Sequence, residues 1–592
     1  GDGGTAVVWA DGYTRFAGHI ASRGGALGGD GGQVEVSGKA VLDYFGKADL
    51  TAIAGETGEL LLDPTNLEIV DSFSQNIQID YDSDPRLIEP YSAITTSTLR
   101  VNELLNSLAM ANVTVSTLGS PSASGQDGTI TVLDPINAGV IGNLLKLEAA
   151  GDVRFEADVI SAGNLNLWAE AEGKVIQQSG ASLGIDSSPL NNIRLTASGS
   201  AFDGIGIRTG DIHAAHLELE PDGGDVEQNT GSQLDVNEVV LTGSFQESFN
   251  LDEANRIGKF AGQVIGGDVT LRNTIDLEIA NTLTTKIGRN SLRPELRTYG
   301  GDIVIESTQN VSGVHANTRN NAFDPSSAAG DITIRLVADN ARMSVGGAAG
   351  SGVLSMGGGL VNVRAENGTT TFATTGSNSD LLVGGFSSSE SGGMGDIMFS
   401  ASRDLIFEGG GSDLTGGTVT LNAGRDLRFK KNLTATTVVA QTETTISNEA
   451  TISADSLSFL DDLTVTLPTY AAGDIVADVD LSTTNGSDPY VDLRGSLTID
   501  APDSNVRVRA KNGGTAKDTV TLADIDANNL ELVAASGTAV AQAPGSRLRV
   551  NELILVGGGA GGFALDGNNI IDDLAGDTQA PVEIRHIDTI TD

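Results

Sequence analysis

One short unit recurs along the chain and decides its fold: Gly267-Asp268-Val269-Thr270-Leu271. Gly-Asp is a turn signal, because Gly adopts positive φ angles and Asp bonds local backbone N–H groups. The residues that follow alternate between apolar and polar, which is typical of a strand with one buried face. Gly-Asp followed by Val or Ile begins at residues 151, 210, 224, 267, 301, 330, 395 and 473. The sequence therefore predicts many short strands separated by tight turns.

Helices are almost absent from this prediction. The best candidate is Leu99–Met110, in which Leu104, Leu105 and Leu108 form one apolar face. Many short strands without intervening helices leave three all-β architectures open, namely sandwich arrays, propellers and a parallel β-helix.

Internal repetition and turn spacing favour the β-helix. Residues 231–262 and 545–576 align without a gap, with 15 of 32 positions identical. The spacing between Gly-Asp units varies from 14 to 78 residues, whereas propeller blades recur at about 40–45 residues. The turns of a β-helix, here called rungs, tolerate loops of variable length. With roughly 20–25 residues per rung, the chain would form an elongated rod of about 25 rungs and on the order of 120 Å.

Composition and charge exclude several classes of partner. The chain has 592 residues with 76 Gly, no Cys and only 4% aromatic residues, so its core must consist of Val, Ile, Leu and Ala. Its 35 basic and 78 acidic residues give a net charge of −43, which disfavours nucleic acid and anionic membranes. No apolar run approaches 18 residues, so no transmembrane segment is expected. The first twenty residues lack a signal-peptide pattern, and we expect the chain to be an internal piece of a longer product.

Five strings within the first 66 residues form a recognisable pattern. They are Gly3-Gly4-Thr5-Ala6-Val7-Val8-Trp9-Ala10-Asp11-Gly12, Thr14-Arg15-Phe16, Ile20-Ala21-Ser22-Arg23-Gly24-Gly25, Gly28-Gly29-Asp30-Gly31-Gly32-Gln33-Val34-Glu35-Val36-Ser37-Gly38-Lys39 and Leu60-Leu61-Leu62-Asp63-Pro64-Thr65-Asn66. Together they resemble the filamentous-haemagglutinin-like exoproteins of bacterial two-partner secretion. Weaker similarity continues at 102–105, 112–115, 251–257 and 565–571.

The resemblance implies a right-handed parallel β-helix that an outer-membrane transporter exports to the cell surface or the medium. It also implies an adhesin, although some members of the family carry toxin modules. The family's secretion domain, which the transporter recognises, has no counterpart here, and the β-pattern continues to Ile587 and Ile590. We expect three regions: family-signature rungs at 1–66, an irregular insertion with a short helix at 67–128, and a shaft at 129–592.

Residues that could carry out catalysis or bind a metal are few, and we expect no catalytic, cofactor or metal site. His213 and His216 are three residues apart and would face opposite sides of a strand, which makes them a poor metal pair. The acidic pairs Asp461-Asp462, Asp572-Asp573 and Asp82/Asp84 are the candidates for acid–base catalysis.

Calcium is the ion that the sequence favours most. Gly28-Gly29-Asp30-Gly31-Gly32 is loosely similar to the calcium-binding nonapeptide of β-rolls, but it occurs once, where such sites need tandem copies. A glycine-rich turn between rungs explains this string better. Trp9, in the family-signature string, is expected to pack in the core or on a rung face.

Two functions remain open at this stage. The first is a non-enzymatic, extracellular adhesin or filament segment that projects a binding surface towards a glycan or protein on a host or neighbouring cell. The second is a β-helix polysaccharide lyase or hydrolase that acts on extracellular glycans. Residues 71–99 and 376–395 are the most irregular stretches, and we expect any protruding binding loops there.

Overall fold

The structure is a computed structural model of the 592-residue chain. It describes residues 1–71, 77–80, 87–90, 96–119, 126–187, 189–199, 204–243, 246–279, 296–299, 301–309, 311–312, 315–319, 332–336, 342–345, 362–365, 370–374, 380–383, 397–401, 404–407, 412–424, 427–429, 433–440, 444–447, 452–459, 463–466, 476–479, 490–493, 496–510, 519–534, 539–557, 562–579 and 581–587.

The chain is a parallel β-helix. The described residues form 53 strands and one helix, and the strands pair in parallel with partners about one rung away in sequence. This confirms the predicted all-β, parallel β-helix class; the right-handed winding stays a prediction. The chain divides into two compact units, Gly1–Gly301 and Asp302–Asp592.

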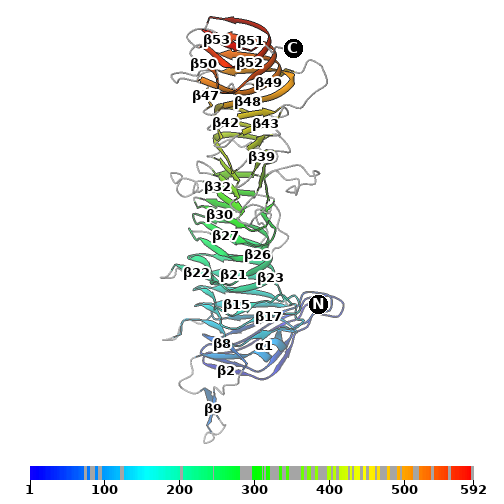
Figure 1. The fold of residues 1–592 in the computed structure, drawn as a ribbon. Coiled ribbons are helices and arrows are strands. Elements are labelled where there is room, and N and C mark those ends of the chain that lie inside the picture. Colours follow the sequence, from blue (N-terminus) through cyan, green and yellow to red (C-terminus); the bar gives the residue numbers. More distant parts are fainter. Residues whose placement is uncertain are drawn as a thin grey trace. The chain divides into compact units, whose positions relative to one another are not determined.

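The first unit is built on two long faces (Figure 1). One face, here called sheet A, contains in spatial order β1 (Thr5–Ala10), β4 (Gln33–Gly38), β7 (Glu59–Asp63), β12 (Asn112–Ser116), β15 (Leu144–Ala149), β18 (Asn166–Ala171), β21 (Leu190–Ala197), β23 (Asp211–Pro221), β25 (Leu234–Thr242) and β26 (Phe249–Ile265). The other, sheet B, contains β2 (Tyr13–Phe16), β5 (Val41–Tyr44), β11 (Ser97–Arg100), β8 (Leu67–Val70), β13 (Ile130–Val132), β16 (Val153–Phe155), β19 (Val175–Gln177), β22 (Ile205–Thr209), β24 (Asp225–Gln228), the start of β26, and β27 (Val269–Asn273).

Shorter strands close the third side of the coil. One pair is β3 (His19–Ala21) with β6 (Lys47–Asp49). A second ladder contains β14 (Ile136–Asn137), β17 (Val159–Ile160) and β20 (Ser182–Leu183), and β20 pairs with the start of β23. Near the end of this unit, β28 (Leu277–Ile279) and β29 (Leu296–Tyr299) both pair with β26.

Described strands of the segment 67–128 take part in both sheets of the coil. Strand β11 lies between β5 and β8 in sheet B, and β12 lies between β7 and β15 in sheet A. The strands β9 (Ile77–Asp80) and β10 (Leu87–Pro90) form an antiparallel hairpin apart from the two sheets. The helix α1 (Val101–Leu108) falls inside the predicted stretch and buries Leu104 and Leu108.

The core is a set of apolar columns that run from rung to rung. Along sheet A one column contains Val34, Leu60, Val113, Leu145, Leu167, Ile193, Leu217, Val239 and Phe260. Each of these side chains is at most 2% exposed. From Leu145 onward its members are 22, 26, 24, 22 and 21 positions apart, close to the predicted rung length. Because a buried Leu or Ile contributes about 1.5–3 kcal/mol, this column is a main source of stability.

The Gly-Asp units precede strands as predicted, but three of their Asp side chains bond the backbone of the next rung. Strands β16, β23, β24 and β27 begin at or directly after such units. The Oδ1 atoms of Asp152, Asp211 and Asp225 accept hydrogen bonds from backbone N–H groups 22, 22 and 23 residues ahead, at 2.9, 2.8 and 2.7 Å. The expectation of local bonds was wrong for these three residues. Parallel stacking brings the corresponding N–H of the next rung within reach, so each Asp joins two rungs.

A buried amide pair recurs together with the long internal repeat. Asn255 is fully buried, and its Oδ1 accepts from the Leu234 N–H at 2.9 Å and from Gln228 Nε2 at 2.8 Å. Its Nδ2 donates to Gln228 Oε1 at 3.0 Å and to the Leu251 carbonyl at 2.9 Å. The same four bonds recur 314 residues later, made by Asn569 with the Leu548 N–H, both amide atoms of Gln542 and the Leu565 carbonyl.

The second unit also consists of parallel ladders. One contains β30 (Ile303–Ser307), β33 (Ile332–Leu336), β36 (Thr370–Thr374), β38 (Ile397–Ala401), β40 (Ser412–Ala423), β42 (Leu433–Ala440), β44 (Ile452–Phe459) and β47 (Tyr490–Leu493). Another contains β34 (Arg342–Val345), β37 (Asp380–Val383), β39 (Leu405–Phe407), β41 (Leu427–Phe429), β43 (Thr444–Ser447), β45 (Leu463–Thr466), β48 (Ser496–Ala510), β49 (Thr519–Ala534), β51 (Leu548–Gly557) and β52 (Gly562–Thr578).

Shorter strands complete this unit. They are β31 (Val311–Ser312), β32 (His315–Arg319), β35 (Asn362–Ala365), β46 (Val476–Val479), β50 (Ala539–Gln542) and β53 (Val582–His586).

Candidate functional site

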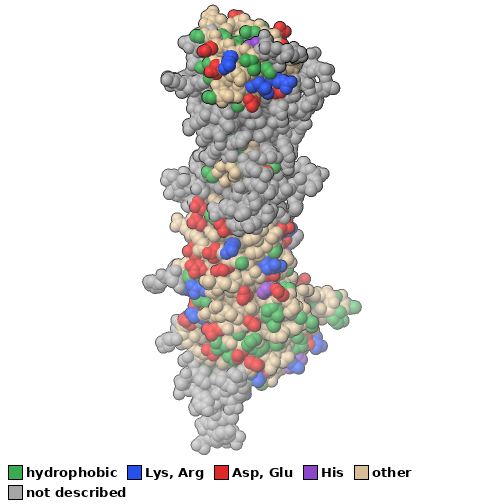
Figure 2. Space-filling view, viewed as in Figure 1, with side chains coloured by type: hydrophobic (Ala, Val, Ile, Leu, Met, Phe, Trp, Pro, Cys, Tyr) green, Lys and Arg blue, Asp and Glu red, His purple; other side chains and the backbone are tan. Residues whose placement is uncertain are grey.

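The outer face of sheet A carries a ladder of large polar side chains. Lys146, Trp168, Arg194 and Glu218 are register partners on β15, β18, β21 and β23. They face outward because their strand neighbours on either side fill the core. Figure 2 shows acidic and basic side chains interspersed on the visible face of the first unit.

Trp168 lies between two cations in this ladder. Lys146 Nζ is 4.1 Å and Arg194 Cζ is 4.6 Å from its ring centroid, which are cation–π distances. Because Lys146 and Arg194 are its register partners on opposite sides, the ring faces are already occupied. Trp168 therefore does not offer an open face on which a sugar could stack.

Acidic side chains compensate the charges of the two cations. Arg194 is bonded to Glu220, and its Nε lies 3.7 Å from Glu218 Oε2. Lys146 contacts Glu148, and its Nζ lies 3.8 Å from Glu170 Oε2. Burial lowers the pKa of Lys146, while the charges of Glu170 and Glu59 oppose that shift. The ladder is thus a compensated charge network, which suits rung-to-rung cohesion better than proton transfer.

Two carboxyl groups with raised pKa values lie in the rungs formed by residues 1–66. Burial raises the pKa of the Asp63 carboxyl to about 6, against a hydrogen bond from the Gly119 backbone that lowers it. Burial also raises the pKa of Asp43, whose Oδ2 accepts a 2.6 Å hydrogen bond from the Tyr13 hydroxyl. Both shifts are caused first by desolvation, and Asp43 is only 2% exposed, so solvent and substrate have little access to it.

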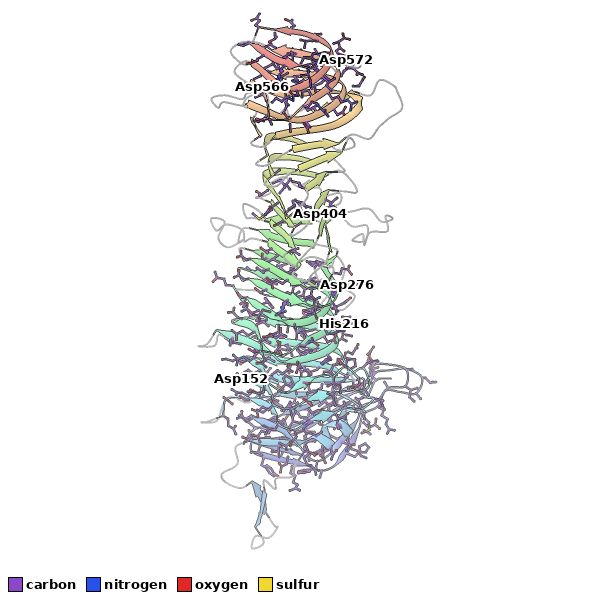
Figure 3. All side chains as sticks on the ribbon, in the orientation of Figure 1. Asp152, His216, Asp276, Asp404, Asp566 and Asp572 are labelled. Carbon is purple, nitrogen blue, oxygen red and sulfur yellow. The ribbon has the colours of Figure 1, made fainter. Side chains whose placement is uncertain are left out.

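One of the predicted acidic pairs falls within the described residues. Asp572 (Figure 3) and Asp573 lie on β52 and are both exposed. Asp573 pairs in register with Glu552. Asp461-Asp462, Asp82 and Asp84 lie outside the described residues.

The string Gly28–Gly32 forms part of a tightly stacked lobe. Gly28 and Gly29 have φ angles of 133° and 122°, which favour glycine, and a Cβ on Gly31 would lie 1.9 Å from the Leu50 carbonyl oxygen. Asp30 Oδ1 accepts a 2.8 Å hydrogen bond from the Glu56 N–H. This arrangement matches the interpretation as a glycine-rich turn between rungs.

Trp9 lies on the outer side of β1, where it is 53% exposed and pairs in register with Ser37. Of the two positions expected, core or rung face, Trp9 occupies the rung face. Strand alternation is the cause, because Ala6, Val8 and Ala10 take the inward positions.

His213 and His216 both face outward on β23, contrary to the expectation of opposite sides. Ile212, Ala214 and Leu217 are buried, so the alternation shifts by one residue at Ala215. His216 Nδ1 lies 3.1 Å from Glu238 Oε2 of the next rung (Figure 3).

The shift brings His213 next to two carboxylates. Its Nδ1 is 2.9 Å from Asp186 Oδ1 and 4.0 Å from Asp235 Oδ2. Ligand atoms of these three residues lie within 4.8 Å of one another, the only such group of three among the described residues. Sequence reasoning missed the group because its members are 27 and 22 positions apart. One signal was present, since Asp235 follows His213 by one rung length.

The remaining histidines make no comparable group in the part of the chain that the structure describes. His19 is exposed on β3, and His586 Nδ1 accepts a 3.3 Å hydrogen bond from the Ile571 N–H. The side chain of His315 lies outside the described residues.

No protein-family model matches the chain, and no curated protein sequence matches it. Among the described residues, no helix is long and apolar enough to cross a membrane.

Proposed function

We propose that this chain is a non-enzymatic, extracellular adhesin or filament segment of the filamentous-haemagglutinin-like class. An outer-membrane two-partner-secretion transporter would export it by recognising a domain that is not in this sequence. Its partner would be a glycan or protein on a host or neighbouring cell.

The observation that carries the proposal is the arrangement of the family-signature residues. The strings that resemble the family form β1, β4 and β7, which pair in continuous parallel register. The lobe of Gly24–Gly32 packs its backbone so closely that added Cβ atoms at Gly24, Gly29 and Gly31 would collide with neighbouring backbone. The stacking of these rungs thus requires glycine at three positions of the resembling strings.

The fold suits a mechanical role. In a solenoid each rung contacts only its neighbours, so stability is spread along the axis. The apolar column and the inter-rung bonds of Asp152, Asp211 and Asp225 repeat this contact from rung to rung. A chain exported unfolded can fold one rung at a time outside the cell, and the charge of −43 keeps the stacked strands soluble.

The pairing of charges on sheet A supports the non-enzymatic part of the proposal. Glycoside hydrolysis needs two carboxyl groups beside the sugar, one of them with a raised pKa. On the outer face of sheet A, Lys146 and Arg194 contact the glutamates around them. Of the two carboxyl groups with raised pKa values, Asp43 is only 2% exposed, so a sugar has little access to it.

Adhesion and turnover can be measured on the same protein. Purified chain is immobilised on beads, which are tested for retention on epithelial and bacterial cell layers and on arrays of extracellular polysaccharides. Beads coated with a fragment of another β-helix of similar charge provide the control. Specific retention, without release of reducing sugar or unsaturated products with or without calcium, is the expected result.

Two outcomes would contradict the proposal. Catalytic turnover of a polysaccharide above background would establish the lyase or hydrolase function instead. Retention equal to that of the control beads on every surface would remove the adhesive role.

Export is tested separately. The chain is fused behind a two-partner secretion domain and expressed with its matching transporter. We expect the fusion to reach the medium or the cell surface, and retention in the periplasm would contradict the assigned route.

A further inference from the structure

Three side chains from three successive rungs converge at one corner of the first unit. Asp186 lies in the loop between β20 and β21, His213 lies on β23, and Asp235 lies on β25. We propose that they bind one divalent transition-metal ion, with Zn²⁺ as the best-matched ion. This inference does not depend on the proposed adhesive function.

The distances between the ligand atoms suit a metal ion. Zinc binds imidazole nitrogen and carboxylate oxygen at about 2.0–2.2 Å, which places neighbouring ligand atoms roughly 3–4 Å apart. The separations of 2.9 and 4.0 Å from His213 Nδ1 fall at the two ends of this range. Small rotations of the carboxylates are sufficient to equalise them, and Asp186 is free to rotate because its side chain is 84% exposed.

The surroundings of the His213 Nδ1 atom also favour a metal ion. His213 Nδ1 is shielded from solvent and makes no hydrogen bond, although an Asp186 oxygen lies 2.9 Å away. A shielded polar atom without a hydrogen bond is costly. A metal ion between Nδ1 and the carboxylates would use the nitrogen lone pair and neutralise both acids.

The donor set selects the class of ion. One imidazole and two carboxylates favour zinc or a similar first-row ion, whereas calcium takes six to eight oxygen ligands. With three protein ligands, a fourth position would remain for water or a ligand.

Arg256 competes with the ion. Its Nε lies 3.1 Å from Asp235 Oδ2, the same oxygen that faces His213. The Arg256 side chain is 47% exposed, so it can move away, but its positive charge opposes a second cation. Removing that charge should therefore tighten metal binding.

The neighbouring His216 provides a matched control. It lies on the same strand, three residues further on, and also faces a carboxylate, that of Glu238. It does not belong to the three-ligand group.

Zinc binding is measured by isothermal titration calorimetry on the full chain, with Ca²⁺ as the comparison ion. We expect one Zn²⁺ per chain. Substitution His213→Ala or Asp235→Asn should weaken affinity at least tenfold, Arg256→Gln should tighten it several-fold, and His216→Ala should leave it within twofold. Circular dichroism establishes that each variant is folded, and a Co²⁺ absorption spectrum that disappears in His213→Ala provides a second readout.

The proposal is overturned if the wild type does not bind Zn²⁺, or if folded His213→Ala binds as tightly as His216→Ala. It is equally overturned if Ca²⁺ binds with the same affinity and stoichiometry, because adventitious binding to an acidic surface would then explain the result.

Discussion

Replacing Asn255 with Ala should open the β-helix locally. The Asn255 side chain is fully buried and makes four hydrogen bonds, three to the preceding turn of the coil and one within its own turn. Alanine would leave the Leu234 N–H and the Leu251 carbonyl without their partner, and Gln228 would lose two bonds.

The expected loss of stability comes mainly from the Leu234 N–H and the Leu251 carbonyl. Each buried backbone group that loses this partner costs about 1–3 kcal/mol, so the free energy of local opening should fall by roughly 4 kcal/mol. At about 1.4 kcal/mol per factor of ten, amide exchange at Leu234 should become about a thousandfold faster. The loss should stay near this rung, because each rung is stabilised mainly by its neighbours.

Native-state hydrogen exchange with peptide resolution measures this effect on the full chain. Asn237→Ala is the control, because Asn237 lies in the same repeat but is exposed. We expect exchange around Leu234 to accelerate in Asn255→Ala and to stay nearly unchanged in Asn237→Ala. Equal exchange in the two variants would refute the assignment of a stabilising role to the amide pair.

The repeat supplies an internal replicate. Asn569 makes the same four contacts in the second unit. Asn569→Ala should therefore accelerate exchange at Leu548 by a similar factor while leaving Leu234 unaffected.

Three further predictions concern the first unit. Gly31→Ala should destabilise it by about 1–3 kcal/mol in chemical denaturation, because the new Cβ would lie 1.9 Å from a backbone oxygen; Gly12→Ala, with open space around it, should change little. Arg194→Met should cost about 3 kcal/mol, because buried glutamates would lose their cation; a loss below 0.5 kcal/mol would contradict this. Burial raises the pKa of Asp63 from 3.8 to about 6, so wild-type stability should fall as pH rises through that interval. Asp63→Asn should therefore be about 1–3 kcal/mol more stable than wild type at pH 8 and equally stable at pH 3 in thermal melts; equal melting at pH 8 would count against it.

The fold could be predicted because its signals are local. The alternation of apolar and polar residues after Gly-Asp predicted the strands. The variable spacing of these turns favoured a β-helix over a propeller. Leu104 and Leu108 likewise indicated the helix α1 from their spacing alone.

The candidate metal site could not be predicted in this way. The assumption of strict alternation placed His213 and His216 on opposite faces, whereas the chain shifts its alternation at Ala215. Asp186 reaches His213 from a loop whose position depends on how the rungs stack.

The sequence by itself determined that this chain is all-β, built of short turns and strands, and acidic outside an aliphatic core, because turn chemistry and alternation act between residues a few positions apart. Only the tertiary structure decided which carboxylates meet His213, that Asn255 bonds Gln228, and that Asp152 joins two rungs. These contacts link residues more than twenty positions apart, and the exact length of each rung decides which side chains become neighbours.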